Sequence, residues 1–187
     1  MGNPVSSATE FLIRTLFDLY ILVVMLRFLL QLVRADFYNP LSQFVVRATN
    51  PPLVPLRRLI PGFSGVDVSA LLLALALKMA ELAIISLVRG ASGIDLMALI
   101  VVSMADLTQL VVYIFIIAII IQVVLSWVSP GGYNPMTVLL HHLTEPLMRP
   151  ARRIVPTFSG LDLSPLVVLI VLQLVLILIV EPLYRLA

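Results

Sequence analysis

The chain has 187 residues, of which 61% are hydrophobic and 12% are charged, and it contains no cysteine. Soluble globular domains carry charge at roughly a quarter of their positions, so this composition excludes that class and makes the lipid bilayer the solvent. The lack of cysteine excludes disulfides, thiol catalysis and thiolate metal sites. The net charge is only +2, and the basic residues gather in two segments. Basic residues gathered in this way set the topology of a membrane protein or contact lipid headgroups. We expect no contact with nucleic acid.

Four apolar runs predict an all-α membrane protein with four transmembrane helices. They cover residues 11–33, 70–88, 107–128 and 166–180, the last extended by its flanking residues to 182. The stretch 94–104 is also apolar but too short to cross a bilayer. We therefore expect it to be an interfacial or buried piece of the connection and not a fifth span.

Charged side chains occur inside the first two runs, whereas the third and fourth runs carry none. A charge that faces lipid costs several kcal/mol, so these side chains must face protein or water. We predict that the first two spans pack together, with Arg27 or Lys78 paired to Glu81, and that this role is structural. Ion conduction is the alternative hypothesis for the four residues Asp18, Arg27, Lys78 and Glu81.

A segment of 32 residues occurs twice, at 38–69 and at 133–164, with a constant offset of 95 and no gap. Each copy lies between two apolar runs. Self-similarity of this kind is the signature of a duplicated structural unit. The chain is therefore predicted to consist of a first repeat (11–88), a connector (89–106) and a second repeat (107–182), each repeat with two spans.

The repeated segment begins with a helical pattern of apolar residues at i, i+3, i+4 and i+7. This pattern predicts a short amphipathic helix that lies in the headgroup plane, and the alternative is a helix packed on the bundle. The four positions of the apolar face are Leu41, Phe44, Val45 and Ala48 in the first copy and Met136, Leu139, Leu140 and Leu143 in the second.

Prolines recur after this face, and each lacks a backbone donor. We expect them to forbid a continuous helix and to leave an irregular segment at the interface or sheltered by protein. The prolines are Pro51, Pro55 and Pro61, matched by Pro146, Pro150 and Pro156.

An arginine pair lies among the prolines of each copy. Guanidinium groups bind phosphate bidentately or bond to free backbone carbonyls, so we expect these side chains to contact anionic lipid or a partner protein. The alternative is that they only set topology. The pairs are Arg57 with Arg58 and Arg152 with Arg153.

Each copy ends in a predicted turn and helix cap. The glycines Gly65 and Gly160 suit a turn with positive φ, and the serines Ser69 and Ser164 suit the N-cap of the following span. Two residues before each serine comes an aspartate, Asp67 or Asp162. These carboxylates can pair with the arginines of the same segment while they complement the positive end of the next helix.

Together these motifs resemble the bacterial YGGT family of membrane proteins, with two tandem copies of its domain. The features that carry the resemblance are the NP before the amphipathic helix, the P-x-x-x-P-x-R-R-x-[IV]-P run and the F-S-G-x-D-x-S before the next span. The family has no settled biochemical activity, so the resemblance implies no catalytic residues. Similar proteins have been linked to cell division and nucleoid distribution, to assembly of a cytochrome complex in chloroplasts, and to tolerance of osmotic stress.

The sequence contains no P-loop, dinucleotide fingerprint, zinc-protease motif or hydrolase elbow. His141 and His142 are adjacent, so on a helix they point about 100° apart and cannot form an i, i+4 metal pair. We therefore predict that the protein is not an enzyme and holds no cofactor or metal.

Two functional hypotheses remain. The first is an inner-membrane scaffold or assembly factor that engages anionic lipid or an unidentified membrane protein, with a homo-oligomer left open. The second is an ion channel or transporter subunit linked to osmotic stress tolerance. The first is favoured because Arg27, Lys78 and Glu81 correspond to Gln122, Gln173 and Leu176, so the repeats share no charged lane.

Basic residues also predict the topology, because positive charge marks cytoplasmic loops. The segments after the first and third spans are therefore expected in the cytoplasm of a bacterium and both termini outside. The arginines that lead to this assignment are Arg34, Arg47, Arg57, Arg58, Arg149, Arg152 and Arg153.

Overall fold

The computed structural model describes residues 4–60, 62, 65–91, 93, 95–128, 134–155 and 162–186. These residues are predominantly helical, and none of them forms a β-strand. In chain order the helices are α1 (Pro4–Leu32), α2 (Pro40–Leu59), α3 (Val68–Val88), α4 (Leu96–Val128), α5 (Pro135–Ile154), α6 (Ser164–Val175) and α7 (Glu181–Arg185), with a π-helical segment, η1 (Leu176–Val180), between the last two.

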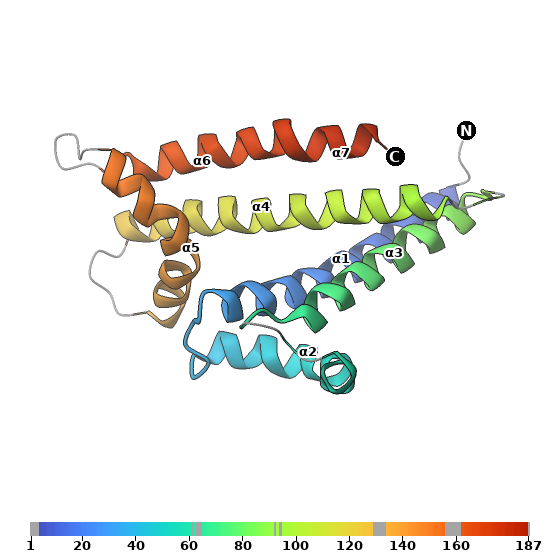
Figure 1. Ribbon diagram of the computed structural model, residues 1–187, viewed down its shortest axis with the longest axis horizontal. Coiled ribbons are helices and arrows are strands. Elements are labelled where there is room, and N and C mark those ends of the chain that lie inside the picture. The colour runs from blue at the N-terminus through green and yellow to red at the C-terminus, as the bar shows by residue number, and fades with distance from the viewer. Residues whose placement is uncertain are drawn as a thin grey trace.

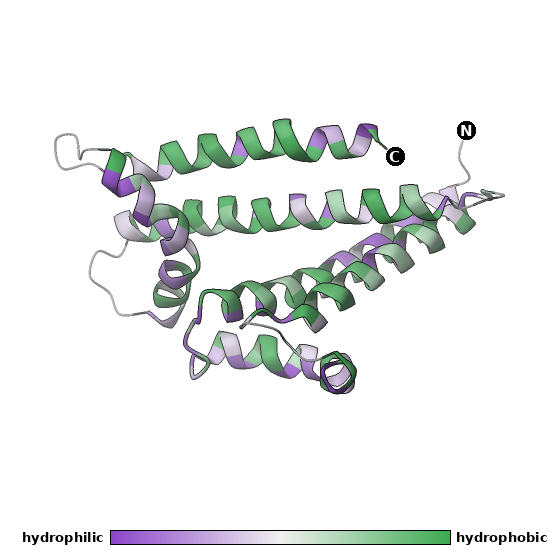
Figure 2. Cartoon of the chain, in the orientation of Figure 1, coloured by the Kyte–Doolittle hydropathy of each residue, from purple (hydrophilic) through white to green (hydrophobic). Residues whose placement is uncertain are grey.

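Within this part of the chain, four helices are long and apolar enough to cross a membrane, which confirms the predicted all-α, four-span fold. They are α1, α3, α4 and the continuous helix Ser164–Arg185. Figure 2 shows that apolar residues dominate these spans, whereas polar residues are concentrated on α2 and α5. Along the bundle α1 packs on α3, α3 on α4 and α4 on α6. The short helices α2 and α5 lie at the span ends away from the two termini (Figure 1).

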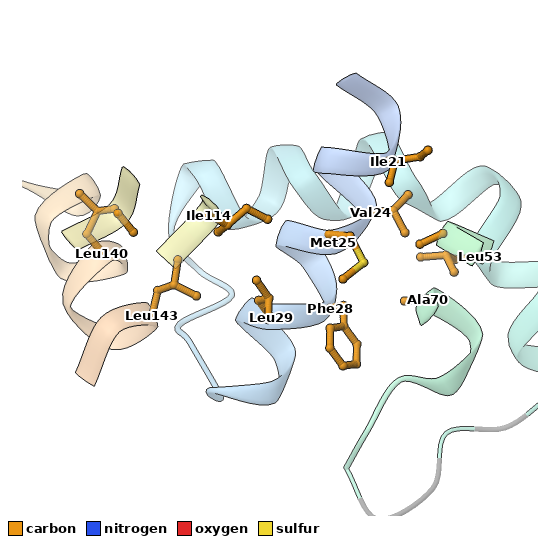
Figure 3. Packing of buried hydrophobic residues seen from close by; sticks show 12 residues of the cluster. Ile21, Val24, Met25, Phe28, Leu29, Leu53, Ala70, Ile114, Leu140 and Leu143 are labelled. Carbon is orange, nitrogen blue, oxygen red and sulfur yellow. The ribbon is translucent and has the colours of Figure 1, made fainter. Parts of the chain in front are cut away.

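Each repeat has its own apolar core, but the first core is shared. It is built around Ile21, Met25 and Leu53, and it also takes Leu140 and Leu143 from α5 of the second repeat. Figure 3 shows these two leucines beside the α1 side chains. The second core lies between α4, α5 and α6. Fully buried alanines, Ala70 and Ala74, let α3 approach α1 closely.

The stretch 94–104 is not a fifth span, as predicted, but its described residues from Leu96 onward are not a separate piece either, because they belong to the third spanning helix. Helix α4 begins at Leu96 and runs without a break into the third span. Its start is fixed by Asp95, whose side chain accepts a hydrogen bond from the backbone N–H of Met97 at 2.8 Å. Because no glycine or proline occurs between Leu96 and Val128, nothing stops the helix before the apolar run.

The prediction that prolines prevent a continuous helix was also wrong. Helix α2 continues through Pro51, Pro52 and Pro55, and α5 continues through Pro146 and Pro150. In Figure 1 the first part of α2 runs across the view while its last turns are seen end-on, so the helix bends instead of ending. Bending is the usual response of a helix that loses backbone donors to proline.

A side chain from α1 replaces one of these lost donors. Pro52 has no N–H to give to the carbonyl of Ala48, and the hydroxyl of Tyr20 on α1 donates to that oxygen at 3.3 Å. The Thr49 hydroxyl bonds back to the Val45 carbonyl at 2.7 Å, a contact that often bends helices. The α1 surface therefore stabilises the bent form of α2.

Only part of the predicted apolar face of α2 is buried. Val45 is buried, but Leu41 and Phe44 are 39% and 64% exposed. The buried stripe instead includes two polar side chains and runs along Ser42, Val45, Thr49 and Leu53. Helix α2 packs on α1 and α3 through this mixed stripe, while Leu41 and Phe44 stay on its outer face, so an orientation in the headgroup plane stays a prediction.

The fourth span carries a local irregularity. Its backbone changes to a π-helix over Leu176–Val180, directly before Pro182. The N–H of Glu181 bonds to the carbonyl of Leu176, five residues earlier. Because Pro182 removes a donor, the wider turn redistributes the hydrogen bonds that an α-helix would lose.

Both α2 and α5 are capped by an asparagine, but only one cap also joins the repeats. The side-chain oxygens of Asn39 and Asn134 accept from the N–H of Leu41 and Met136, each at 2.9 Å. Asn39 additionally donates from Nδ2 to the carbonyl of Pro135 at 2.7 Å. The same cap therefore has a second, inter-repeat role in the first copy.

This difference is testable by matched substitutions. Losing a cap costs about 1 kcal/mol, and losing a further hydrogen bond costs about 1 kcal/mol more. We expect Asn39→Ala to lower the free energy of unfolding by about 2 kcal/mol and Asn134→Ala by about 1 kcal/mol, measured by denaturant titration in detergent micelles. Asn39→Ser keeps a capping oxygen but loses the bond to Pro135, so it should cost about 1 kcal/mol, half the loss of Asn39→Ala. Equal losses for the two alanine variants would refute the inter-repeat contribution.

Candidate functional site

The end of α2 is tied to the start of α3 by a salt bridge between Arg57 and Asp67. Arg57 Nε donates to Asp67 Oδ1 at 3.4 Å, and Nη2 donates to Asp67 Oδ2 and, at 3.1 Å, to Gln31 Oε1 on α1. The Asp67 side chain is 2% exposed. We call this contact the Arg–Asp clasp, and it joins the ends of α1, α2 and α3.

The second repeat contains the same clasp, 95 residues later. Arg152 Nε donates to Asp162 Oδ2 at 3.2 Å, and Nη1 donates to Glu145 Oε2 at 3.2 Å. Burial raises the pKa of Asp162, but hydrogen bonds from Ser164 and Arg152 outweigh it and hold that pKa below its usual value. The clasp is therefore a feature of the repeat unit and not of one copy.

The second arginine of each pair is placed differently. Arg58 and Arg153 are exposed, and neither has a hydrogen-bond or ion-pair partner among the described residues. Sequence reasoning treated the four arginines alike. The structure separates each pair into one arginine that is paired with an aspartate of the same repeat and one that is exposed without such a partner.

Ser69 does not cap α3, so that prediction was wrong. Helix α3 begins one residue earlier, at Val68, and the carboxylate of Asp67 accepts from the N–H of Ala70 at 3.3 Å. Ser69 is fully buried and donates to the carbonyl of Ile60 at 2.5 Å, which ties the end of α2 to α3. Gly65 has a φ of +85°, a conformation that L side chains rarely adopt.

Ser164 is likewise not an N-cap. It is the first residue of α6, and its N–H donates to Asp162 Oδ1 at 2.9 Å. In both repeats the aspartate thus receives a backbone N–H from the next helix because it precedes the helix start, where unsatisfied donors are exposed. Gly160, Pro61 and Pro156 lie outside the described residues.

A buried polar contact anchors α2 to the first span. Arg27 is 4% exposed, and its Nη1 donates to Thr49 Oγ1 at 2.7 Å, to Asn50 Oδ1 at 2.8 Å and to the carbonyl of Val46 at 3.1 Å. Arg27 therefore serves α2 and does not pair with Glu81. Of the two predicted partners, only Lys78 reaches Glu81.

The second repeat makes the equivalent anchor without a charge. Gln122 takes the place of Arg27, and Thr144 takes the place of Thr49. The Thr144 hydroxyl donates to Gln122 Oε1, and Gln122 Nε2 lies 3.4 Å from His141 Nδ1. A polar residue near the end of the span therefore holds the threonine of the short helix in both copies. The recurrence of that threonine at offset 95 was the available sequence signal.

The intramembrane charges of the first two spans form a cluster around Lys78. Its Nζ lies 2.9 Å from Asp18 Oδ1, 2.9 Å from Glu81 Oε2 and 3.4 Å from Asp106 Oδ2. Glu81 is fully buried. We call these four side chains the lysine cluster, and in it three carboxylates surround one ammonium group.

Asp106 was missed as an intramembrane residue, because the sequence analysis placed it in the connector. Since α4 starts at Leu96, Asp106 lies inside the third spanning helix, and the view that the third span is uncharged was wrong. The hydroxyl of Tyr184 donates to Asp106 Oδ1 and, at 2.8 Å, to Gln109 Oε1. The fourth spanning helix is not free of charge either, because it extends to Arg185 and includes Glu181.

A cavity of about 500 Å³ opens beside the lysine cluster, between α1, α3 and α4. Asp18 and Asp106 line it together with Arg14, Gln109 and Tyr113. Gln109 and Tyr113 match Arg14 and Asp18 at offset 95, so the cavity lies between equivalent helices of the two repeats. Its charges come mainly from the first repeat.

The described residues contain no group of three or more His, Cys, Asp or Glu side chains that could hold a metal ion. His141 Nε2 lies 3.7 Å from Glu145 Oε2 and His141 Nδ1 faces Gln122, so this ring lies among polar neighbours on the surface of α5.

Fold and site together define a multi-pass membrane protein made of two tandem repeats, each with two spans around a bent amphipathic helix. The family model described as CCB3/YggT matches residues 6–88 and again residues 101–183. The chain belongs to this CCB3/YggT family.

Curated relatives support the assignment. Over 177 residues, 94% of this chain and 90% of the relative, the chain is 46% identical to uncharacterized protein PA0392 of Pseudomonas aeruginosa. It is 42% identical to a Vibrio alginolyticus protein over 89% of this chain and 90% of the relative. It is 34% identical to YggT of Escherichia coli K12 over 88% of this chain and 85% of the relative. The names of these three proteins state no activity. No solved structure matches the chain significantly.

The lysine cluster predicts unequal effects of its members on stability. Lys78→Met leaves Glu81 buried without its cation, so we expect a loss of about 3 kcal/mol or more in the free energy of unfolding. Glu81→Gln leaves Lys78 with Asp18 and Asp106 and should cost clearly less. The double variant should be more stable than Lys78→Met alone, because the unpaired buried charge is gone. Denaturant titration in micelles measures all three, and additive losses would contradict the pairing.

Proposed function

We propose that the chain is a non-enzymatic inner-membrane scaffold or assembly factor. Its two short helices engage anionic lipid headgroups or the acidic surface of a membrane-protein partner. The observation that carries the proposal is the repeated Arg–Asp clasp. In both copies the clasp fixes the last turn of a short helix and leaves the neighbouring arginine, Arg58 or Arg153, exposed.

The geometry supports a binding platform for a physical reason. Arg57 and Arg152 lose much of their freedom to the carboxylates that hold them, so the neighbouring backbone is ordered before any partner arrives. Preorganisation of this kind lowers the entropic cost of binding. Since α2 and α5 lie at the same ends of the spans, both exposed arginines serve the same membrane face.

The second candidate is an ion-conducting subunit, and one specific observation favours it. The lysine cluster places three carboxylates and a lysine beside a cavity of about 500 Å³ within the spans. Ionisable residues inside a membrane often mark ion or proton pathways. The scaffold remains the better supported proposal, because Lys78 and Glu81 have no charged counterparts in the second repeat, whereas the clasp occurs in both.

Removing the exposed arginines should weaken retention of the partner. Each arginine near an anionic surface contributes about 1 kcal/mol, so Arg58→Gln with Arg153→Gln should reduce binding on the order of thirtyfold. The measurement is quantitative affinity isolation in mild detergent, with mass spectrometry of the proteins and lipids that co-purify. Arg185→Gln, at the other end of the bundle, is the control and should change nothing.

Unchanged co-purification in the double variant would refute the platform. Purified protein in liposomes provides the comparison with the second candidate. Selective ion flux that is lost in Glu81→Gln but insensitive to Arg58 and Arg153 would favour ion conduction.

Topology belongs to the same proposal, with the short helices cytoplasmic and both termini outside. The chain has no cysteine, so single cysteines report positions without background. Leu59 is 80% exposed at the end of α2, and Ala91 is exposed in the turn between α3 and α4. In intact bacterial cells an impermeant maleimide should label Ala91→Cys but not Leu59→Cys. The reverse pattern would invert the assignment.

A further inference from the structure

A basic cavity of about 670 Å³ lies between the end of α1 and the start of α2. Three arginines from two helices line it, Arg27, Arg47 and Arg57, together with the amides Gln31 and Gln43. Phe37 and Val46 complete an apolar side. The cavity is therefore amphipathic, with its cationic groups gathered around one space.

The charge in this cavity is only partly neutralised. Asp67 pairs with Arg57, so three arginines and one carboxylate leave an excess of two positive charges. Arg27 is 4% exposed and makes its described hydrogen bonds through Nη1 alone, so its Nη2 and Nε donate to no described residue. Arg47 is exposed, without a partner among the described residues. Donors for an anion are thus already in place.

The second repeat has the corresponding cavity, with a volume of about 460 Å³. Gln122, Ser126 and Arg152 line it, and at offset 95 they match Arg27, Gln31 and Arg57. The two cavities therefore share three equivalent positions and differ in the rest of their lining. This equivalence is independent of the exposed arginines Arg58 and Arg153.

The charge of the second cavity is different. Its single arginine, Arg152, is held by two carboxylates, those of Asp162 and Glu145. The positions that match Arg27 and Arg47 are Gln122 and His142. One arginine against two carboxylates gives no excess of positive charge, so this cavity has no attraction for an anion.

We propose that the first-repeat cavity binds the phosphate of an anionic phospholipid, one molecule per chain, and that the second-repeat cavity does not. Guanidinium forks bind phosphate oxygens bidentately, and Arg27 and Arg47, which both line this cavity, have donors without a partner among the described residues. The apolar side at Phe37 and Val46 suits the glycerol and first acyl carbons. The cavity lies at the end of a span, where headgroups occur. This inference deepens the proposed function and rests on it for the membrane setting.

Native mass spectrometry of the full chain in detergent with added phosphatidylglycerol tests the site. Wild-type protein should retain one lipid. Arg47 is exposed and has no hydrogen-bond or ion-pair partner among the described residues, so Arg47→Gln should leave thermal stability unchanged while weakening retention roughly fivefold, the equivalent of one headgroup-level arginine. His142→Gln changes the matching residue of the other repeat and should have no effect.

A gain-of-function variant makes the test stronger. Gln122→Arg, His142→Arg and Glu145→Asn together place in and around the second cavity the residues that the first repeat has at these three positions. This triple variant should retain two lipids. Retention of one lipid by a folded triple variant would overturn the charge argument, and full retention by Arg47→Gln would overturn the location.

Two further arms identify the ligand. Phosphatidylcholine in place of phosphatidylglycerol should not be retained, and equal retention would overturn selectivity for anionic lipid. Inorganic phosphate should compete only weakly, and binding of phosphate without lipid would overturn the lipid assignment. Arg58→Gln with Arg153→Gln separates this site from the platform. That variant should keep the lipid while it loses the partner, so failure of either proposal is visible without the other.

Discussion

The hydrogen bonds of Arg27 to α2 are the interaction on which the first repeat depends. A guanidinium buried near the end of a span needs partners, and α2 supplies a hydroxyl, an amide and a backbone carbonyl within 3.1 Å. These bonds hold α2 against α1 beside the prolines that bend it. The basic cavity exists because Arg27 is fixed on one side and the Arg–Asp clasp closes the other.

Comparison of the two repeats shows which features belong to the unit. The asparagine cap, the buried threonine and the arginine–aspartate pair of the clasp occur twice at a constant offset, although the residue that bonds to the threonine differs. Charge within the spans is not conserved between the copies. Gln122 bonds to the threonine of the short helix as Arg27 does, but it carries no charge. The contact between span and short helix is therefore kept although the local charge differs. The two repeats therefore hold their short helices in the same way but differ in the charge within their spans.

Much of the fold followed from periodicity and composition, because span length and repetition are encoded along the sequence. Four spans and the two short helices could be predicted in this way. The failures have local physical causes. Prolines were expected to end α2, but Tyr20 from another helix satisfies a freed carbonyl, and no linear pattern reveals that contact. Asp106 was assigned to a connector because hydropathy changes there, whereas helix continuity depends on the absence of breakers. The N-caps predicted at Ser69 and Ser164 were wrong by one or two residues. In α3 the carboxylate of Asp67, and not the hydroxyl of Ser69, accepts the backbone N–H at the start of the helix.

The two leucines that α5 contributes to the first core make the two repeats depend on each other unequally. Leu140 and Leu143 belong to the same cluster as Leu29 and Ile114, and the matching positions in α2 are the smaller Val45 and Ala48. The core between α4, α5 and α6 contains no α2 side chain among the described residues. The first repeat would therefore lose part of its core without the second, whereas the second repeat builds its core from its own helices.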